Sequence, residues 1–219
     1  MDADPAATTS SRADEIATLL DWKRRVFELY RHVRTARAPE PAWESWRRAR
    51  DELFRTHPQS PLPSGARGDF TGLDYFPYDP AARVVAGVAP VASESVAIGA
   101  SAGETILFER FGQAVFTLGG ETRTLDLYWL EAYGGGLLLP LGDGTNSGET
   151  YPAGRYVLDT VKGADLGTVA GGLVLDFNFA YNPSCAYDPR WVCPLAPPAN
   201  RLAVPIRAGE RAPRTTTSP

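Results

Sequence analysis

The sequence predicts a mainly β fold with N-terminal helices, namely an antiparallel β-barrel or β-sandwich with two amphipathic helices packed on it. Helical periodicity is confined to roughly the first sixty residues. After them come short β-branched or aromatic runs, separated by turn residues at a spacing of about ten residues, which is typical of antiparallel sandwiches and barrels. No strand–helix–strand rhythm follows residue 60, which excludes a doubly wound fold.

The chain of 219 residues is expected to form one domain over 11–210. This domain has a helical part at 11–57 and a β-rich part at 58–210. The segments 1–10 and 211–219 are short, polar and without periodicity, so both are expected to be disordered tails.

Two helices are expected in the helical part. Ser11 and Asp14 form a capping pattern at the start of the first, whose apolar residues recur at three- and four-residue steps in one stripe: Ile16, Leu19, Leu20, Phe27, Tyr30 and Val33. The second is expected to begin at Pro41 and to end before Pro58, because the residue preceding a proline is pushed out of helical geometry. One side of it carries Trp43, Trp46, Leu53 and Phe54, with Arg47, Arg48, Arg50 and Arg55 elsewhere.

The β-rich part is expected to contain strands at 83–88, 94–99, 105–111, 114–118, 122–130, 137–141, 155–161 and 172–178. The clearest pair is a hairpin over 114–130, where Gly119 and Gly120 supply the positive φ that a tight turn requires. Alternation in 124–129 is partial, as expected for a sheet with one buried face.

The composition excludes several classes of protein. The net charge is −4, and the eleven basic residues among the first sixty are matched by ten acidic ones, so neither nucleic acid nor a membrane is an expected partner. No apolar run approaches the length of a membrane span and no secretory signal is visible, so a cytoplasmic location is expected.

Cys185 and Cys193 are the two cysteines of the chain. A stable disulfide is disfavoured in a reducing cytoplasm. A structural zinc site needs four ligands, whereas His32 and His57 lie in the helical part without metal-ligand spacing. No metal and no cofactor are therefore expected.

A polar loop at 143–156 (DGTNSGETYPAGRY) leads into a strand that begins with Arg155. The loop begins like a calcium-binding loop, but its twelfth position is Gly154 where a bidentate Glu is required. It also lacks the spacing and the lysine of a phosphate-binding loop. Arg155 is suited to bidentate binding of a carboxylate or a phosphate. The alternative is an internal ion pair with Asp143 or Asp176.

The segment 176–187 (DFNFAYNPSCAY) joins the end of an expected strand to a turn at 182–183. Strand alternation places Asp176, Asn178 and Ala180 on one side. Since Asp and Asn are depleted in strands, these side chains are expected to line a pocket or to cap backbone groups of the following loops. Further on, Asn200 follows two prolines and is available to hydrogen-bond neighbouring backbone.

These two motifs give the chain a family resemblance. DGTNSGETYPAGRY at 143–156 and DFNFAYNPSCAYDPRWVCPLAPPANRL at 176–202 resemble the bacterial and archaeal domain-of-unknown-function family 1684, as do HPQSPL at 57–62, FTGLDYFP at 70–77 and AGE at 208–210. The resemblance runs from about residue 15 to 210. Phe179 stands where a basic residue is common in that family, which implies a less anionic ligand for this member. The resemblance implies membership and no activity.

We expect a small-molecule pocket at one end of the β-barrel or sandwich. Its ligand-binding residues would be Tyr151, Tyr156, Asn178, Tyr181, Asn182 and Tyr187. If the protein is an enzyme, the expected chemistry is metal-independent acid/base catalysis, with Asp176 as general acid or base, Arg155 as the electrophilic or anion-binding group and Cys185 as the nucleophile. The alternative is a non-enzymatic interaction module in which the same motifs are a structural latch, with Arg155 paired to Asp176. The sequence does not predict the oligomeric state.

Overall fold

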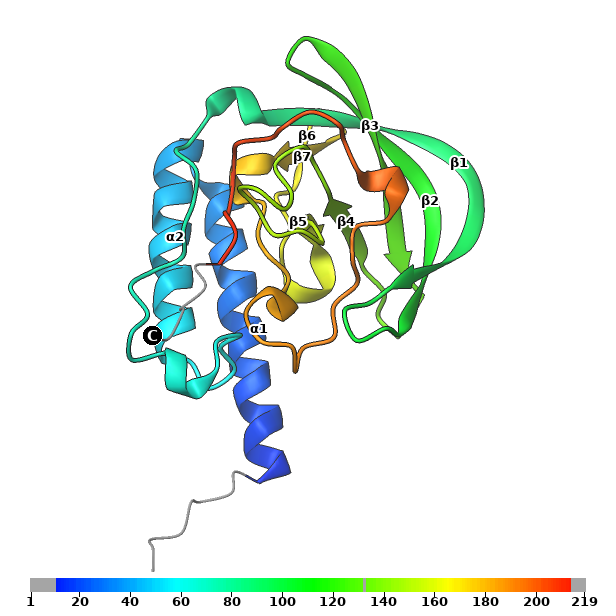
Figure 1. Cartoon of the computed structure of the whole chain (residues 1–219). Coiled ribbons are helices and arrows are strands. Elements are labelled where there is room, and N and C mark those ends of the chain that lie inside the picture. The colour runs from blue at the N-terminus through cyan, green and yellow to red at the C-terminus, as the bar shows by residue number, and fades with distance from the viewer. Residues whose placement is uncertain (1–10, 132, 214–219) are drawn as a thin grey trace, which may run out of the picture.

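A computed structural model describes residues 11–131 and 133–213, which form two α-helices and seven β-strands around a shared core (Figure 1). The expected tail at 1–10 lies outside the described residues, as does 214–219. Residues 211–213 are described and are held by backbone hydrogen bonds, from the Arg211 N–H to the Asp74 carbonyl and from the Ala212 N–H to the Glu149 carbonyl. None of the described helices is both long enough and apolar enough to cross a membrane.

Helix α1 spans Arg12–Thr35 and begins with the predicted cap, in which Ser11 and Asp14 form a complete capping box. The stripe predicted for its buried face is only partly right. Tyr30 is buried and Val33 packs on the core, together with Trp22, Val26 and Leu29, but four residues of the stripe face solvent: Ile16, Leu19, Leu20 and Phe27. The buried face is thus rotated from the predicted one, and the N-terminal half of α1 projects beyond the rest of the molecule (Figure 1).

Helix α2 spans Pro39–Thr56, two residues longer at its start than predicted, because proline is well placed in a first helical turn. Its four expected apolar residues are buried. Arg50, expected away from them, also faces the core. Its guanidinium carbon lies 4.9 Å from the centre of the Trp46 ring and 5.1 Å from that of Phe54. Arg50 therefore brings a positive charge into the interior of the protein.

The seven strands form one antiparallel sheet in the order β5-β4-β3-β2-β1-β7-β6. Their bounds are β1 Arg83–Gly99, β2 Thr105–Leu118, β3 Glu121–Leu130, β4 Leu137–Leu141, β5 Arg155–Asp159, β6 Thr168–Val169 and β7 Gly172–Asp176. The predicted mainly β class with N-terminal helices is confirmed. The predicted barrel is not formed, because β5 and β6 are the two edge strands of the described sheet and do not pair with each other. One bridge reaches across the opening, where Tyr156 and Tyr181 exchange hydrogen bonds of 2.8 and 3.0 Å.

The predicted hairpin is confirmed, with Gly119 and Gly120 at φ 62° and 80° between β2 and β3. The strands expected at 83–88 and 94–99 are one strand, β1, and those expected at 105–111 and 114–118 are one strand, β2. In each, an irregularity in the register takes the place of the expected turn, between Pro90 and Glu94 and between Arg110 and Gly112.

The irregularity in β2 determines which side of the sheet its residues face. Phe108 belongs to a small cluster with Tyr128 and Tyr156, whereas Phe116 belongs to the main core. Side chains two residues apart share a face in a regular strand, so an extra residue at 111 is needed to move these two to opposite sides. The bulge therefore gives the bent sheet two apolar faces.

Strand β7 ends at Asp176, two residues earlier than predicted. The Asp176 carboxylate accepts the Asn178 N–H at 3.0 Å and starts a turn of 3-10 helix at Phe177–Phe179. The strand alternation expected for Asp176, Asn178 and Ala180 is therefore wrong beyond Asp176, and the whole turn is buried.

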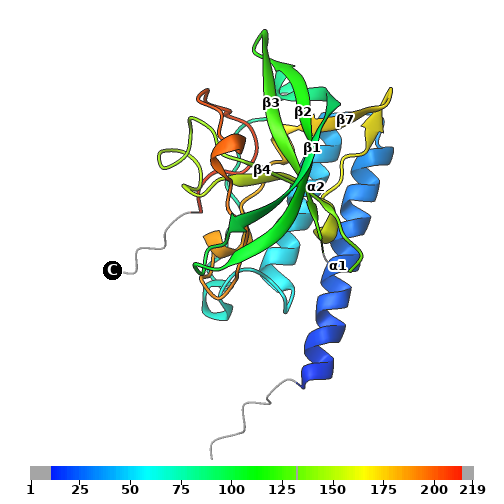
Figure 2. The ribbon, with the colours of Figure 1, turned by 90° about the vertical axis from the view of Figure 1, so that its right-hand side faces the viewer.

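The 142–154 loop and the C-terminal segment 200–213 lie against each other on the side of the sheet away from α1 (Figure 2). Backbone hydrogen bonds join Gly142 to Asn200 and Leu202, and Gly144 to Val204. The end of the loop is also closely packed: Gly154 has a φ of +97°, and a Cβ there would lie 2.6 Å from the Leu141 carbonyl oxygen. A side chain at this position is therefore excluded by both space and backbone geometry.

Gly154→Ala should lower the free energy of unfolding by about 2 kcal/mol or more, since backbone strain of this kind alone costs about 1–3 kcal/mol. Gly148→Ala in the same loop is the matched control, because its Cβ would meet no atom closer than 3.9 Å. Urea unfolding of both variants measures the difference. Equal stabilities would contradict the close packing described here.

Candidate functional site

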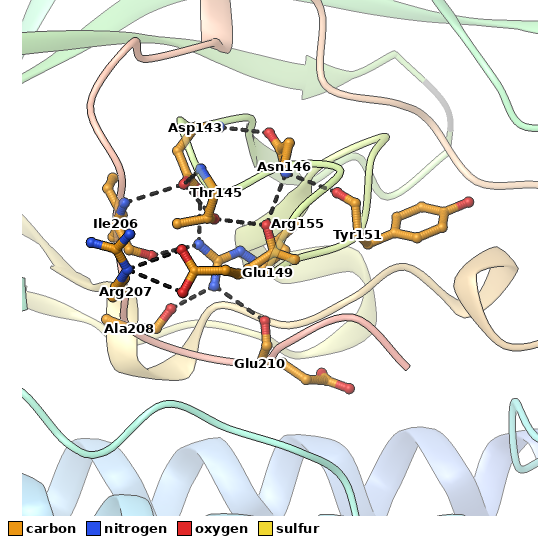
Figure 3. A network of polar contacts seen from close by, with 11 residues as sticks. Asp143, Thr145, Asn146, Glu149, Tyr151, Arg155, Ile206, Arg207, Ala208 and Glu210 are labelled. Atoms are coloured by element: carbon orange, nitrogen blue, oxygen red, sulfur yellow. Dashed lines mark hydrogen bonds and ion pairs between the residues drawn. The ribbon is translucent and has the colours of Figure 1, made fainter. Parts of the chain in front are cut away.

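The side chain of Arg155 is completely buried and holds the C-terminal segment in place (Figure 3). Its Nη1 donates to the carbonyl oxygens of Ala208 and Glu210, and its Nη2 donates to the carbonyl of Ile206 at 3.1 Å. Nη2 also donates to Asp143 Oδ2 at 2.7 Å in an ion pair from which solvent is excluded. We call Asp143, Arg155 and the three carbonyls of Ile206, Ala208 and Glu210 the latch.

The second carboxylate oxygen of Asp143 organises its own loop. Asp143 Oδ1 accepts from the Thr145 N–H at 2.8 Å, from the Thr145 hydroxyl at 2.6 Å and from the Ile206 N–H at 3.2 Å. Asn146 completes the turn by donating to the Tyr151 carbonyl at 2.8 Å. The polar side chains of the 143–156 loop therefore hydrogen-bond within the loop and to the C-terminal segment.

The latch places one positive and one negative charge in the interior of the protein. Burial lowers the pKa of Arg155, and the neighbouring Asp143 carboxylate opposes that shift. Four of the five N–H groups of a guanidinium are bonded here, and among the described residues only Nε has no partner. Of the two ion pairs that the sequence left open, the one with Asp143 forms and the one with Asp176 does not.

Asp176 lies elsewhere, beside a cavity of about 230 Å³ between β7 and the C-terminal end of α1. Its Oδ2 is 3.7 Å from Arg83 Nε, beyond hydrogen-bond distance, and burial raises its pKa. Asn178 is fully buried and acts as a brace: its Nδ2 donates to Asp176 Oδ1 and to the Asp79 carbonyl, both at 2.8 Å. Its own carbonyl accepts from Trp43 Nε1 of α2 at 2.7 Å.

Tyr151 and Tyr187 do share a cavity, of about 610 Å³, which we call the tyrosine pocket. It lies between the loop that follows α2 and the end of the C-terminal segment, which are neighbours in Figure 1. In Figure 3 the Tyr151 ring points away from the latch. The Tyr187 hydroxyl is buried and has no hydrogen-bond partner among the described residues. The remaining lining residues are Leu62, Pro63, Ala66, Asp69, Phe70, Thr71, Gly72, Leu73, Asp74, Pro152, Ala186, Glu210, Arg211, Ala212 and Pro213.

Glu210 connects the tyrosine pocket to the helices. Its Oε2 accepts from Arg50 Nη2 at 2.9 Å and from the Asn182 N–H at 3.1 Å. Arg50 Nε donates in turn to the Tyr75 hydroxyl at 3.0 Å. Burial raises the pKa of Glu210 to about 7, and the Arg50 and Arg155 guanidinium groups only partly oppose it.

The other residues that were predicted to bind a ligand form hydrogen bonds with segments around the site. Tyr156 donates its hydroxyl to the Pro194 carbonyl at 2.6 Å, and its ring meets that of Tyr181 edge-on at 5.7 Å. Tyr181 donates its hydroxyl to Asp159 at 3.4 Å. Asn182 donates its Nδ2 to the Arg211 carbonyl at 2.7 Å and so fixes the back of the pocket wall.

Cys185 is half-buried beside Tyr151, whose hydroxyl oxygen lies 3.8 Å from Cys185 Sγ. Cys193 is buried, and its N–H donates to the Ser101 hydroxyl oxygen at 3.1 Å. In the described part of the chain, no three His, Cys, Asp or Glu side chains are grouped in a way that could hold a metal ion.

The prediction from sequence missed Glu210 as a site residue, and it missed Arg50. Glu210 gave no signal beyond its place in the family motif. Arg50 did give one, because residues 46, 50 and 54 are four apart and so lie on one face of a helix. An arginine between two buried aromatic residues of that face is expected to need a buried partner.

Arg155→Met should lower the free energy of unfolding by on the order of 3–5 kcal/mol, because it leaves the Asp143 carboxylate buried without a partner. Adding Asp143→Asn should restore part of the loss by removing that charge. Arg207→Met is the matched control: its pair with Glu149 belongs to the same loop contact but is exposed, and such pairs contribute about 1 kcal/mol or less. If urea unfolding shows the same loss of unfolding free energy in Arg155→Met and in Arg207→Met, the latch is not a stabilising element.

Glu210 should make the protein less stable as the pH rises. Its pKa is raised from 4.5 to about 7 in the folded protein, so its contribution to stability is complete below pH 4.5 and is lost as the pH approaches 7. Glu210→Gln should therefore flatten this part of the pH dependence of the unfolding free energy. Glu121→Gln, at an exposed position, controls for the loss of a charge. An unchanged pH dependence in Glu210→Gln would contradict the raised pKa.

Comparison with known proteins supports the resemblance read from the motifs. A family model described as a protein of unknown function, DUF1684, matches residues 68–211. The chain is also similar to an uncharacterised protein of Haloarcula marismortui whose solution NMR structure is known, with 36% sequence identity, a TM-score of 0.56, and coverage of 78% of this chain and 93% of that one. No curated protein matches the chain. The match covers well over half of the chain, including the latch, most of the tyrosine pocket lining and both cysteines, and the protein belongs to the DUF1684 family.

Proposed function

We propose that the protein binds a small molecule in the tyrosine pocket and that the latch is the structural element that builds the pocket wall. The observation that carries the proposal is a cavity of about 610 Å³ lined by Tyr151 and Tyr187. This volume is in the range of about 300–1,000 Å³ that small-molecule sites occupy, and such sites combine an apolar lining with a few polar groups. Asp69, Thr71 and Asp74 supply polar side chains to this lining.

The lining favours an aromatic or largely apolar ligand that is neutral or cationic. Leu62, Phe70, Leu73 and Pro152 supply apolar surface. The charged lining residues are Asp69, Asp74, Glu210 and Arg211, and Glu210 is already paired with Arg50. Arg211 lies 3.9 Å from Asp74, so its charge is already opposed. An anionic ligand would meet excess negative charge there, in keeping with the less anionic ligand implied by Phe179.

If the pocket is catalytic, its acid/base group is Glu210, whose pKa of about 7 suits proton transfer at neutral pH. This assignment replaces Asp176 as the predicted general acid or base and Arg155 as the predicted electrophilic or anion-binding group. The guanidinium of Arg155 is occupied by the latch, and Asp176 lines the separate cavity beside α1.

A thermal-shift screen of purified protein should identify neutral or cationic aromatic compounds that raise its melting temperature. Ala186→Trp fills the pocket and should abolish the shift, whereas Ala102→Trp, at an exposed turn, should keep it. Stabilisation that survives in a folded Ala186→Trp protein would place the ligand elsewhere, and a screen without any stabilising compound would overturn the proposal.

A non-enzymatic interaction module is the second candidate, and one observation favours it. Ile16, Leu19, Leu20 and Phe27 leave an exposed apolar stripe on α1, with exposed fractions of 45–54%. Large contiguous apolar surfaces of this kind often contact other proteins. A protein partner that is retained by the wild-type chain and lost on Leu19→Glu, together with no ligand in the screen, would favour this candidate.

A further inference from the structure

Helix α1 carries an apolar stripe that stays exposed in the folded chain. Its members are 45–54% exposed: Ile16, Leu19, Leu20 and Phe27. The helix forms the outer edge of the molecule in Figure 2, and its N-terminal half projects beyond the other elements in Figure 1. The face that packs on the core is a different one and includes Val26, Leu29 and Tyr30. The stripe is therefore a second apolar face, on the outside of the protein.

Basic side chains surround this stripe. At about 100° per residue around the helix axis, five of them lie within about 80° of the centre of the stripe: Arg12, Lys23, Arg24, Arg31 and Arg34. The last four line one open hollow of the helix surface together with Leu20, Phe27 and Glu28. The four acidic side chains of α1 lie about 100° or more from the same centre: Asp14, Glu15, Asp21 and Glu28. The folded helix thus separates charges that are matched in the sequence.

The acidic side chains of α1 all have partners. The contacts are Asp14 with Ser11, Glu15 with Arg12, Asp21 with Arg25 and Glu28 with Arg31. Arg34 is also paired, with Asp165 at 3.5 Å. Lys23 and Arg24, in contrast, have no hydrogen bond or ion pair through their side chains with any described residue. Two uncompensated positive charges therefore lie beside the apolar stripe.

We propose that this face of α1 binds the surface of a membrane that contains anionic lipid, with the stripe in the interface and Lys23 and Arg24 at the lipid headgroups. Charge complementarity carries the proposal, because the free charge beside the stripe is positive. Helices with an apolar face and flanking basic residues lie in the plane of a membrane interface in this way. Long basic side chains reach the headgroups while their stems cover apolar surface. The proposal does not depend on a ligand in the tyrosine pocket.

Two other occupants fit the face less well. A second copy, related by a two-fold axis through the middle of the stripe, would bring Lys23 and Arg24 close to the same residues of its partner. Like charges at close range in an interface oppose association. A partner helix usually lies in a groove, whereas every residue that lines the hollow belongs to α1 itself. A lipid surface requires neither a groove nor negative side chains from a protein.

The test is co-sedimentation of the full chain with vesicles of phosphatidylcholine and phosphatidylglycerol in equal parts, and with vesicles of phosphatidylcholine alone. The wild type should bind the anionic vesicles and not the neutral ones. Added salt should weaken the binding, because it screens the charges. The net charge of the chain is −4, so its total charge opposes binding to an anionic surface. Binding would therefore report a local basic face.

Lys23→Gln combined with Arg24→Gln should weaken binding to the anionic vesicles on the order of tenfold. Arg48→Gln combined with Arg201→Gln is the matched control, because it removes the same charge from exposed positions outside α1, and it should not weaken binding. Leu20→Ser should weaken binding too, because it removes an apolar side chain from the stripe. Circular dichroism of each variant confirms that it is folded.

Several results would overturn the proposal. The first is a wild type that does not bind anionic vesicles, or that binds neutral vesicles equally well. The second is an equal loss of binding in the variant at 23 and 24 and in its control. A dimer that Leu20→Ser dissociates would show that a second copy covers the stripe. A protein partner that is lost on Leu20→Ser, without any binding to vesicles, would favour the non-enzymatic interaction module instead.

Discussion

The buried ion pair between Asp143 and Arg155 is the interaction on which the loop side of the molecule depends. The C-terminal segment has few regular strand partners, so its backbone carbonyls need donors from elsewhere. Arg155 supplies them to Ile206, Ala208 and Glu210 from the first position of β5. A guanidinium is suited to this task because its planar donors point in several fixed directions. Its charge is tolerated only because Asp143 is buried with it.

Buried asparagine side chains also hydrogen-bond backbone groups, in the other loops. Asn200 links two strands by donating to the carbonyls of Asp126 and Pro140, both at 2.9 Å. The Asn178 amide accepts the Asp79 N–H and donates to the Asp79 carbonyl, both at 2.8 Å, and the Asn182 amide joins the C-terminal segment to the chain after β7. An amide side chain offers both donors and an acceptor, so one residue can satisfy backbone groups on two segments. The wall of the tyrosine pocket is built of segments fixed in this way.

Part of this architecture could be predicted from the sequence. The capping box at Ser11, the end of α2 before Pro58 and the Gly119–Gly120 hairpin depend on local geometry, and each was predicted. The prediction divided β1 into two strands and β2 into two strands, because bulges and turns leave similar signals in a sequence. The partner of Arg155 was left between two carboxylates, since sequence spacing carries no information on which of two distant loops folds back. Asn178 was expected to line a pocket or to cap backbone groups, and its amide bonds the Asp79 carbonyl. Asn182 was expected to bind a ligand, and its amide donates to the Arg211 carbonyl.

Hydrogen–deuterium exchange of an Arg155→Lys protein tests most directly whether the latch holds the pocket wall. The amides of Ile206, Glu210, Arg211 and Ala212 are all hydrogen-bonded in the wall. We expect these amides to exchange much faster in Arg155→Lys than in the wild type, while the amides of the β2–β3 hairpin keep their protection. Unchanged protection of 206–212, or an equal loss of protection over the whole chain, would contradict the account.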